Sequence, residues 1–195
     1  LFAYGPYARE IDIWADIFPQ LLIAAPCRCE IPPKDAIPFT RPNIQICPQI
    51  QLEGQKWRER FIQLLALPRL TFDLVKAMRQ TDAIQVRCPG SLGFLGSILA
   101  PLFSPYRIAK YAGQWNGFPG EPLSWRFQRR ILRSGWWKAP VTVYGESPGQ
   151  PAHVIPFFTS IMDEGQVERA KSCASIERPR RPLRILFIGR LTLEK

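Results

Sequence analysis

The sequence is poor in the residues that build most metal and nucleophilic sites. It has one histidine, His153, and five cysteines in 195 residues. A catalytic triad or a histidine-based metal site would have to use His153, which stands beside no obvious nucleophile, so we interpret it as a plain loop or strand residue. The cysteines are odd in number and scattered, and they match neither a disulfide framework nor a zinc spacing. Cys27 and Cys29 are too close for half of a structural zinc site. We therefore expect reduced thiols, a cytoplasmic location and no bound metal.

Long apolar runs are also missing, because charges or prolines interrupt each of them, so no transmembrane segment or signal peptide is predicted. The composition, with 46% hydrophobic and 22% charged residues, is that of a globular protein. The net charge of +10 favours an anionic partner such as a phosphate, an acidic membrane surface or a nucleic acid. Nucleic acid is the least attractive of these, since neither an aromatic-rich strand nor a recognition-helix pattern accompanies the charge.

Short apolar segments alternate with amphipathic ones along the chain. Strands are expected at 21–25, 44–47, 83–86, 107–111, 141–144, 153–155 and 185–188, and helices at 7–18, 55–67, 69–80, 92–102, 123–134 and 163–173. Pro68 is expected to begin the helix at 69–80, and Ser91 to cap the apolar, internal helix at 92–102. This order predicts an α/β fold: a Rossmann-like, mostly parallel sheet with flanking helices and with ligands on the loops that follow the strands.

The first candidate site follows the strand at 83–86. Arg87 stands where a basic side chain can reach a ligand, although a structural salt bridge explains it equally well. Gly90 and Ser91 can present backbone N–H groups to an anion at a helix N-terminus. The glycine spacing from Gly90 through Gly93 to Gly96 is not the G-x-G-x-x-G of dinucleotide-binding proteins. Gly93 and Gly96 are therefore better explained by close packing of the helix on the sheet.

The second candidate is the basic helix at 123–134 with the two tryptophans that follow it. Cations beside paired aromatic residues suit the interface of an anionic membrane, whereas a solvated helix face followed by packed aromatic residues has the same pattern. The residues proposed for membrane contact are Arg126, Arg129, Arg130, Arg133, Trp136 and Trp137.

The third candidate closes the sequence. An apolar run at 185–188, of the kind typical of a strand buried on both faces, ends at Gly189 and is followed by Arg190 and Lys195. A glycine and two cations at the end of a parallel strand can hold a diphosphate, with bidentate geometry from the arginine. A solvated loop is the alternative.

This last stretch, ILFIGRLTLEK, resembles the opening of the second domain in family-four glycosyltransferases of the GT-B fold. The segments RIAKYAGQW and VTVYG are similar to the acceptor-side domain of the same family. The resemblance implies that Gly189, Arg190 and Lys195 bind the diphosphate of a nucleotide-sugar donor. It adds Lys110 and Trp115 to the acceptor-side candidates. It also implies a retaining transfer to a glycan or lipid-linked acceptor, with no cofactor beyond the nucleotide-sugar substrate.

The resemblance divides the chain into an acceptor-side domain at 1–177 and, at 178–195, a linker with the first strand of the donor domain. The family's first strand and its glycine-rich loop are not seen, and the paired glutamates of the donor domain would follow Lys195. We therefore expect a fragment, truncated at both ends and inactive by itself, of an enzyme that is cytoplasmic or peripheral on the inner membrane face. A non-catalytic module of doubly wound fold that binds phospholigands or membranes is the alternative, and the missing fingerprint disfavours a nicotinamide-dependent oxidoreductase.

Overall fold

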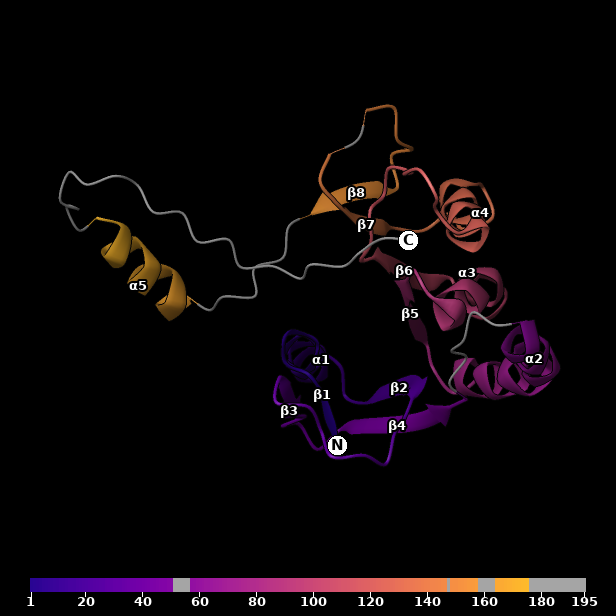
Figure 1. The fold of residues 1–195 in the computed structure, drawn as a ribbon, viewed down its shortest axis with the longest axis horizontal. Coiled ribbons are helices and arrows are strands. Elements are labelled where there is room, and N and C mark those ends of the chain that lie inside the picture. Colours follow the sequence, from indigo (N-terminus) through magenta and orange to yellow (C-terminus); the bar gives the residue numbers. More distant parts are fainter. Residues whose placement is uncertain (51–56, 147, 158–163, 176–195) are drawn as a thin grey trace. The chain divides into compact units, whose positions relative to one another are not determined.

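A computed structural model describes residues 1–50, 57–146, 148–157 and 164–175 (Figure 1). The chain separates into two compact units, Leu1–Thr159 and Ser160–Lys195. In the second unit the described residues form a single helix, α5 (Glu164–Ala174), which buries none of its side chains. The predicted boundary at 177/178 lies outside the described residues and stays a prediction.

The first unit is an α/β fold built on parallel strands. Its largest sheet has the order β5 (Ala83–Cys88), β6 (Tyr106–Tyr111), β7 (Val141–Tyr144) and β8 (Val154–Phe157), and every neighbouring pair is parallel. A second parallel pair joins β2 (Leu21–Pro26) to β4 (Ile44–Gln49). These strands confirm the predicted mostly parallel α/β fold with flanking helices.

Helices connect and cover the parallel strands. Figure 1 shows α2 (Trp57–Met78), α3 (Ser91–Phe103) and α4 (Leu123–Arg133) in succession along one side of the strands, with α1 (Gly5–Ile17) on the other side. None of the helices in the described part of the chain is long and apolar enough to cross a membrane. The core lies between β5–β8 and the helices α3 and α4, and its largest fully buried side chains include Tyr111, Trp115, Leu132 and Trp137.

Local sequence explains where α1 begins and ends. Pro6 lies in its first turn, where a missing N–H costs no hydrogen bond. The helix buries Ala8, Ile11 and Ala15, which recur at helical spacing. The side-chain amide of Asn43 donates to the carbonyl oxygens of Ala15 (2.8 Å) and Phe18 (2.9 Å), so a residue just before β4 satisfies the end of the helix.

Three local predictions were wrong. The segments predicted as two helices form the single helix α2, with Pro68 in its interior. Ser91 is the first helical residue of α3 and does not cap it, because the N-cap is Gly90. The expected proline-rich loop at 26–42 contains β3 (Ala36–Pro38), which pairs antiparallel with β1 (Phe2–Tyr4). These strands are too short for a periodic pattern to reveal them.

Helix α3 is packed more closely than its composition suggests, but through its small residues. Gly93, Gly96, Ser97 and Ala100 are buried, whereas Leu102 is 63% exposed. A β-carbon on Gly96 would lie 3.0 Å from the Val86 side chain. The glycines therefore bring α3 against β5, which confirms the packing interpretation of this motif.

Candidate functional site

Two basic residues stand side by side at the carboxyl ends of the central strands. Arg87 of β5 and Lys110 of β6 are partners in the parallel register. Because side chains alternate along a strand, they project to the sheet face opposite Val86, which packs on α3. The Lys110 side chain is only 8% exposed, while that of Arg87 is 45% exposed. Both residues were predicted as acceptor-side candidates, and the fold brings them together.

A carboxylate from α1 joins these two cations. Glu10 Oε1 accepts a hydrogen bond from Lys110 Nζ at 2.7 Å, and Glu10 Oε2 accepts one from Arg87 Nη1 at 3.2 Å. We call Glu10, Arg87 and Lys110 the edge cluster. One carboxylate faces two cations, so the cluster keeps an excess positive charge at the edge where α/β proteins bind their ligands.

Aromatic rings surround the edge cluster. The Arg87 guanidinium lies 4.9 Å from the ring centre of Tyr7, and the Lys110 ammonium lies 5.2 Å from that of Phe157 on β8. Burial raises the pKa of the Tyr7 hydroxyl, an effect that the neighbouring Arg87 opposes. Sequence analysis missed Glu10, Tyr7 and Phe157. It offered no signal for Glu10, whose contacts span 77 and 100 residues of the chain.

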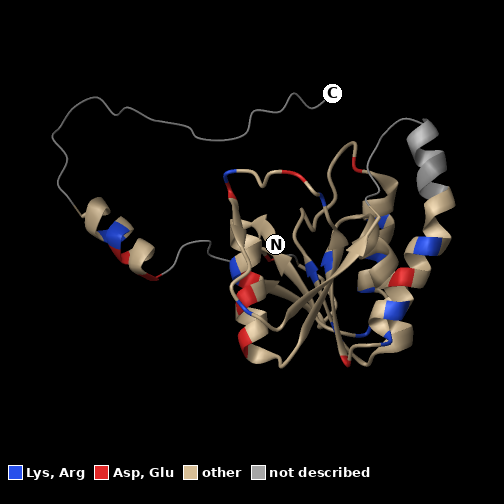
Figure 2. Cartoon of the chain, turned by 90° about the horizontal axis from the view of Figure 1, so that it is seen from below, with Lys and Arg blue, Asp and Glu red and all other residues tan. Residues whose placement is uncertain are grey.

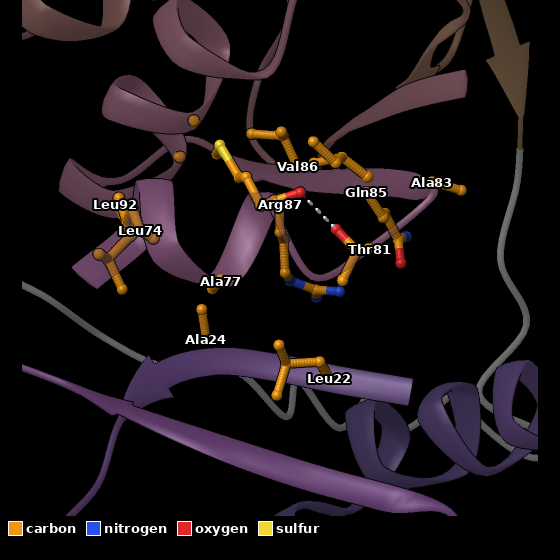
Figure 3. Close-up of a pocket in the computed structure, with 14 residues that line it drawn as sticks. Leu22, Ala24, Leu74, Ala77, Thr81, Ala83, Gln85, Val86, Arg87 and Leu92 are labelled. Atoms are coloured by element: carbon orange, nitrogen blue, oxygen red, sulfur yellow. Dashed lines mark hydrogen bonds between the residues drawn. The ribbon is translucent and has the colours of Figure 1, made fainter. Parts of the chain in front are cut away.

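The start of α3 adjoins the edge cluster. Arg87 and the first-turn residues Leu92 and Gly93 line one pocket of about 150 Å³ (Figure 3). Gly90, the N-cap, has φ +154° and is exposed, as is Ser91. The first N–H groups of a helix have no partner within it and carry partial positive charge, so this turn and Arg87 together suit a phosphate or another anion.

Trp115 does not belong to this site. It is 2% exposed and meets Tyr111 edge to face, with ring centres 5.1 Å apart. Its indole N–H donates to the side-chain oxygen of Gln150 at 3.0 Å. The prediction that Trp115 contacts an acceptor was therefore wrong: the ring fills the core beside β6.

The basic helix α4 divides between the core and the surface. Arg129 is 5% exposed, and its guanidinium pairs with Glu121 and donates to the Tyr111 hydroxyl. Trp137 is fully buried. Membrane contact by Arg129 and Trp137 was thus a wrong prediction, because a buried counter-ion and core packing hold them inside.

The remaining membrane-surface candidates keep different degrees of access. Arg133 packs over the Trp115 ring at 4.8 Å, and burial lowers the pKa of its guanidinium. Arg126 and Arg130 are exposed, and Trp136 is 48% exposed. Two exposed apolar residues of α4, Leu123 and Phe127, adjoin them in sequence and were missed.

The charge of the chain does not gather on the longest helix. Figure 2 shows an acidic residue among the basic ones along α2, where Asp73 lies near Arg69 and Lys76. In α1 the carboxylates of Asp12 and Asp16 face Thr40 and Arg41 instead of the edge cluster. The edge cluster and the exposed end of α4 are therefore the two places with an arrangement that suits an anionic ligand.

No group of three or more His, Cys, Asp or Glu side chains within the described ranges could hold a metal ion. His153 Nε2 lies 2.9 Å from the carbonyl oxygen of Leu132, a contact between β7–β8 and α4 that supports a structural role. Gly189, Arg190 and Lys195 lie outside the described residues, so the donor-site prediction stays a prediction. No family model, no curated protein and no solved structure matches the chain.

Proposed function

We propose that the chain is the acceptor-side part of a nucleotide-sugar-dependent glycosyltransferase of the GT-B fold, followed at 178–195 by the start of its donor domain. The edge cluster is the observation that supports this function best. It puts two cations and a carboxylate at the carboxyl edge of a parallel sheet, beside the N-terminus of α3. A sugar acceptor that carries hydroxyl groups and a phosphate needs both kinds of group.

The residues of the edge cluster have separate roles in this proposal. Arg87, which is the more exposed cation, binds a phosphate of the acceptor, and the first turn of α3 adds backbone N–H donors. Glu10 can accept a hydrogen bond from an acceptor hydroxyl through its carboxylate. Lys110 is nearly buried and orients that carboxylate from the sheet side.

On the donor side, Arg190 and Lys195 bind the diphosphate of the nucleotide-sugar. Their positive charge stabilises the negative charge that develops on the departing diphosphate. The transfer retains the anomeric configuration, and the nucleotide-sugar is a substrate, so the reaction needs no further cofactor.

The exposed end of α4 favours a location at the cytoplasmic face of a membrane. Leu123 is 76% exposed and Phe127 54% exposed, and Arg126 and Arg130 flank Phe127 in sequence. Apolar side chains among cations are typical of helices that lie on anionic lipid. A lipid-linked acceptor would be presented at that surface. The same feature supports the second candidate, a non-catalytic module that binds phospholigands or membranes.

A donor screen on the polypeptide encoded by the complete gene separates these functions. Binding of nucleotide-sugars is measured by titration calorimetry for the wild type and for Arg190→Ala. Loss of a bidentate, charge-assisted contact costs about 1.5–3 kcal/mol, so affinity should fall about 10- to 100-fold. Binding to anionic vesicles without binding of any nucleotide-sugar would favour the non-catalytic module. An unchanged donor affinity in Arg190→Ala would refute the role of that arginine.

A further inference from the structure

Two parallel strands each have a free edge. Within the described residues β2 pairs only with β4, and β5 pairs only with β6. A strand with a neighbour on one side leaves alternate N–H and C=O groups unpaired on the other side. Such groups are a template for another strand.

Both free edges border the same pocket, of about 150 Å³. Figure 3 shows Leu22 and Ala24 of β2 on one side and Ala83, Gln85 and Val86 of β5 on the other. No residue of β4 or β6 lines it, so the pocket lies on the unpaired side of each strand. Its third wall comes from α2 and α3, through Leu74, Ala77, Met78, Leu92, Gly93 and Gly96.

The lining is apolar where an additional strand would need it. Most of these side chains are aliphatic, and the hydroxyl of Thr81 already donates to the carbonyl oxygen of Met78 at 3.2 Å. In β2, Leu22 and Ala24 are only half-buried. The inner strands of a parallel sheet are normally buried on both faces, so β2 has the sequence of an inner strand and the exposure of an edge strand.

The connection of α1 indicates which segment belongs in this pocket. Parallel strands are joined by helical crossovers, and residues 18–20 alone separate α1 from β2. The strand that precedes α1 is β1, which pairs antiparallel with β3 and so is not the parallel partner of β2. Tyr7 and Glu10, in the first half of α1, contact Arg87 at the carboxyl edge of β5. A strand that ran through the pocket parallel to β2 and β5 would end near this edge, where α1 begins.

We propose that the pocket between β2 and β5 is a strand slot. It takes one extended, apolar segment of the same polypeptide, which runs parallel to β2 and β5, leads into β1 and α1, and joins the two parallel sheets into one. The slot forms the sheet itself, so it operates whether or not the protein transfers a sugar.

The test adds such a strand. The N-terminus of the chain is fused, through a flexible Gly-Ser linker, to a six-residue strand of valines and isoleucines. The control fusion has proline at alternate positions of that strand and cannot complete a ladder of hydrogen bonds. Hydrogen–deuterium exchange of the β2 and β5 amides is measured in both proteins. The valine–isoleucine fusion should slow exchange of the edge amides about tenfold or more, equivalent to about 1.4 kcal/mol of added local stability. Equal exchange in the two fusions would overturn the proposal.

Two further variants locate the occupant. Ala24→Arg puts a charge into the slot and should abolish the added protection, whereas Ile31→Arg, at a residue 93% exposed outside the slot, should retain it. Near-ultraviolet circular dichroism verifies that both variants are folded. Protection that persists in Ala24→Arg would refute the location. A chain without residues 183–195 identifies the other possible occupant: if this deletion alone speeds exchange of the β2 and β5 edge amides, the C-terminal apolar run fills the slot and our assignment is wrong.

Discussion

Replacing Glu121 with Gln should destabilise the first unit by about 3 kcal/mol, because it removes the counter-ion of a buried guanidinium. The side chains of Arg129 and Glu121 are 6% and 3% exposed, and the Arg129 Nε atom is buried without a hydrogen-bond partner. Loss of one member of a buried ion pair costs about 3–5 kcal/mol. The lower end applies here, since the glutamine oxygen can still accept one hydrogen bond from Arg129.

Urea unfolding followed by tryptophan fluorescence measures this effect. With a urea dependence of about 2 kcal/mol per molar, the unfolding midpoint should fall by about 1.5 M at pH 7. Arg130→Gln is the matched control on the same helix, and because this arginine is exposed its change should stay within about 0.5 kcal/mol.

The loss should also depend on pH. Hydrogen bonds from Arg129 hold the pKa of the Glu121 carboxyl below its ordinary 4.5. A depressed pKa in the folded state adds stability above the unfolded pKa, and this stability disappears as the pH falls through the folded value. The midpoints of wild type and Glu121→Gln should therefore converge below about pH 4.5. A shift no larger than that of Arg130→Gln, or one equal at all pH values, would refute the buried pair.

Three more perturbations test packing and the edge cluster. Gly93→Ala should cost about 3 kcal/mol in urea unfolding, because its β-carbon would lie 2.2 Å from a main-chain oxygen of β5; Gly135→Ala, where the nearest atom is 3.6 Å away, should be neutral. Burial raises the pKa of the Cys88 thiol to about 12, so iodoacetamide should label the exposed cysteines of the native protein and leave Cys88 unmodified in a mass-spectrometric map. Glu10→Gln should lower the unfolding free energy by about 2 kcal/mol, since Lys110 would keep a nearly buried charge without its carboxylate; an unchanged midpoint would contradict that pairing.

Apolar periodicity was enough to predict most of the fold. The strands β2, β5, β6 and β7 are short apolar runs bounded by turn residues, and each was predicted within two residues. Pro68 misled the interpretation of α2, because a proline can begin a helix or stay inside one that packing stabilises. Leu70, Leu74 and Met78 supply such packing after the proline.

The site was predictable only where position along a strand decides it. Arg87 and Lys110 follow from the carboxyl-end rule, because both stand near the ends of predicted strands. Glu10 reaches them only through tertiary contact, which no local pattern encodes. Arg129 and Arg130 are neighbours with the same local signal, yet Arg129 is buried because Glu121, eight residues earlier, supplies its counter-ion.

A transfer assay tests the central claim most directly. The protein from the complete gene is incubated with a panel of nucleotide-sugars and with lipid-linked or glycan acceptors, and release of the nucleotide is measured for wild type, Arg87→Ala and Arg130→Gln. We predict acceptor-dependent release from at least one donor, a strong loss in Arg87→Ala and none in Arg130→Gln on soluble acceptors. A folded protein that binds no nucleotide-sugar and releases no nucleotide, or equal turnover in Arg87→Ala, would contradict the assignment of the edge cluster to sugar transfer.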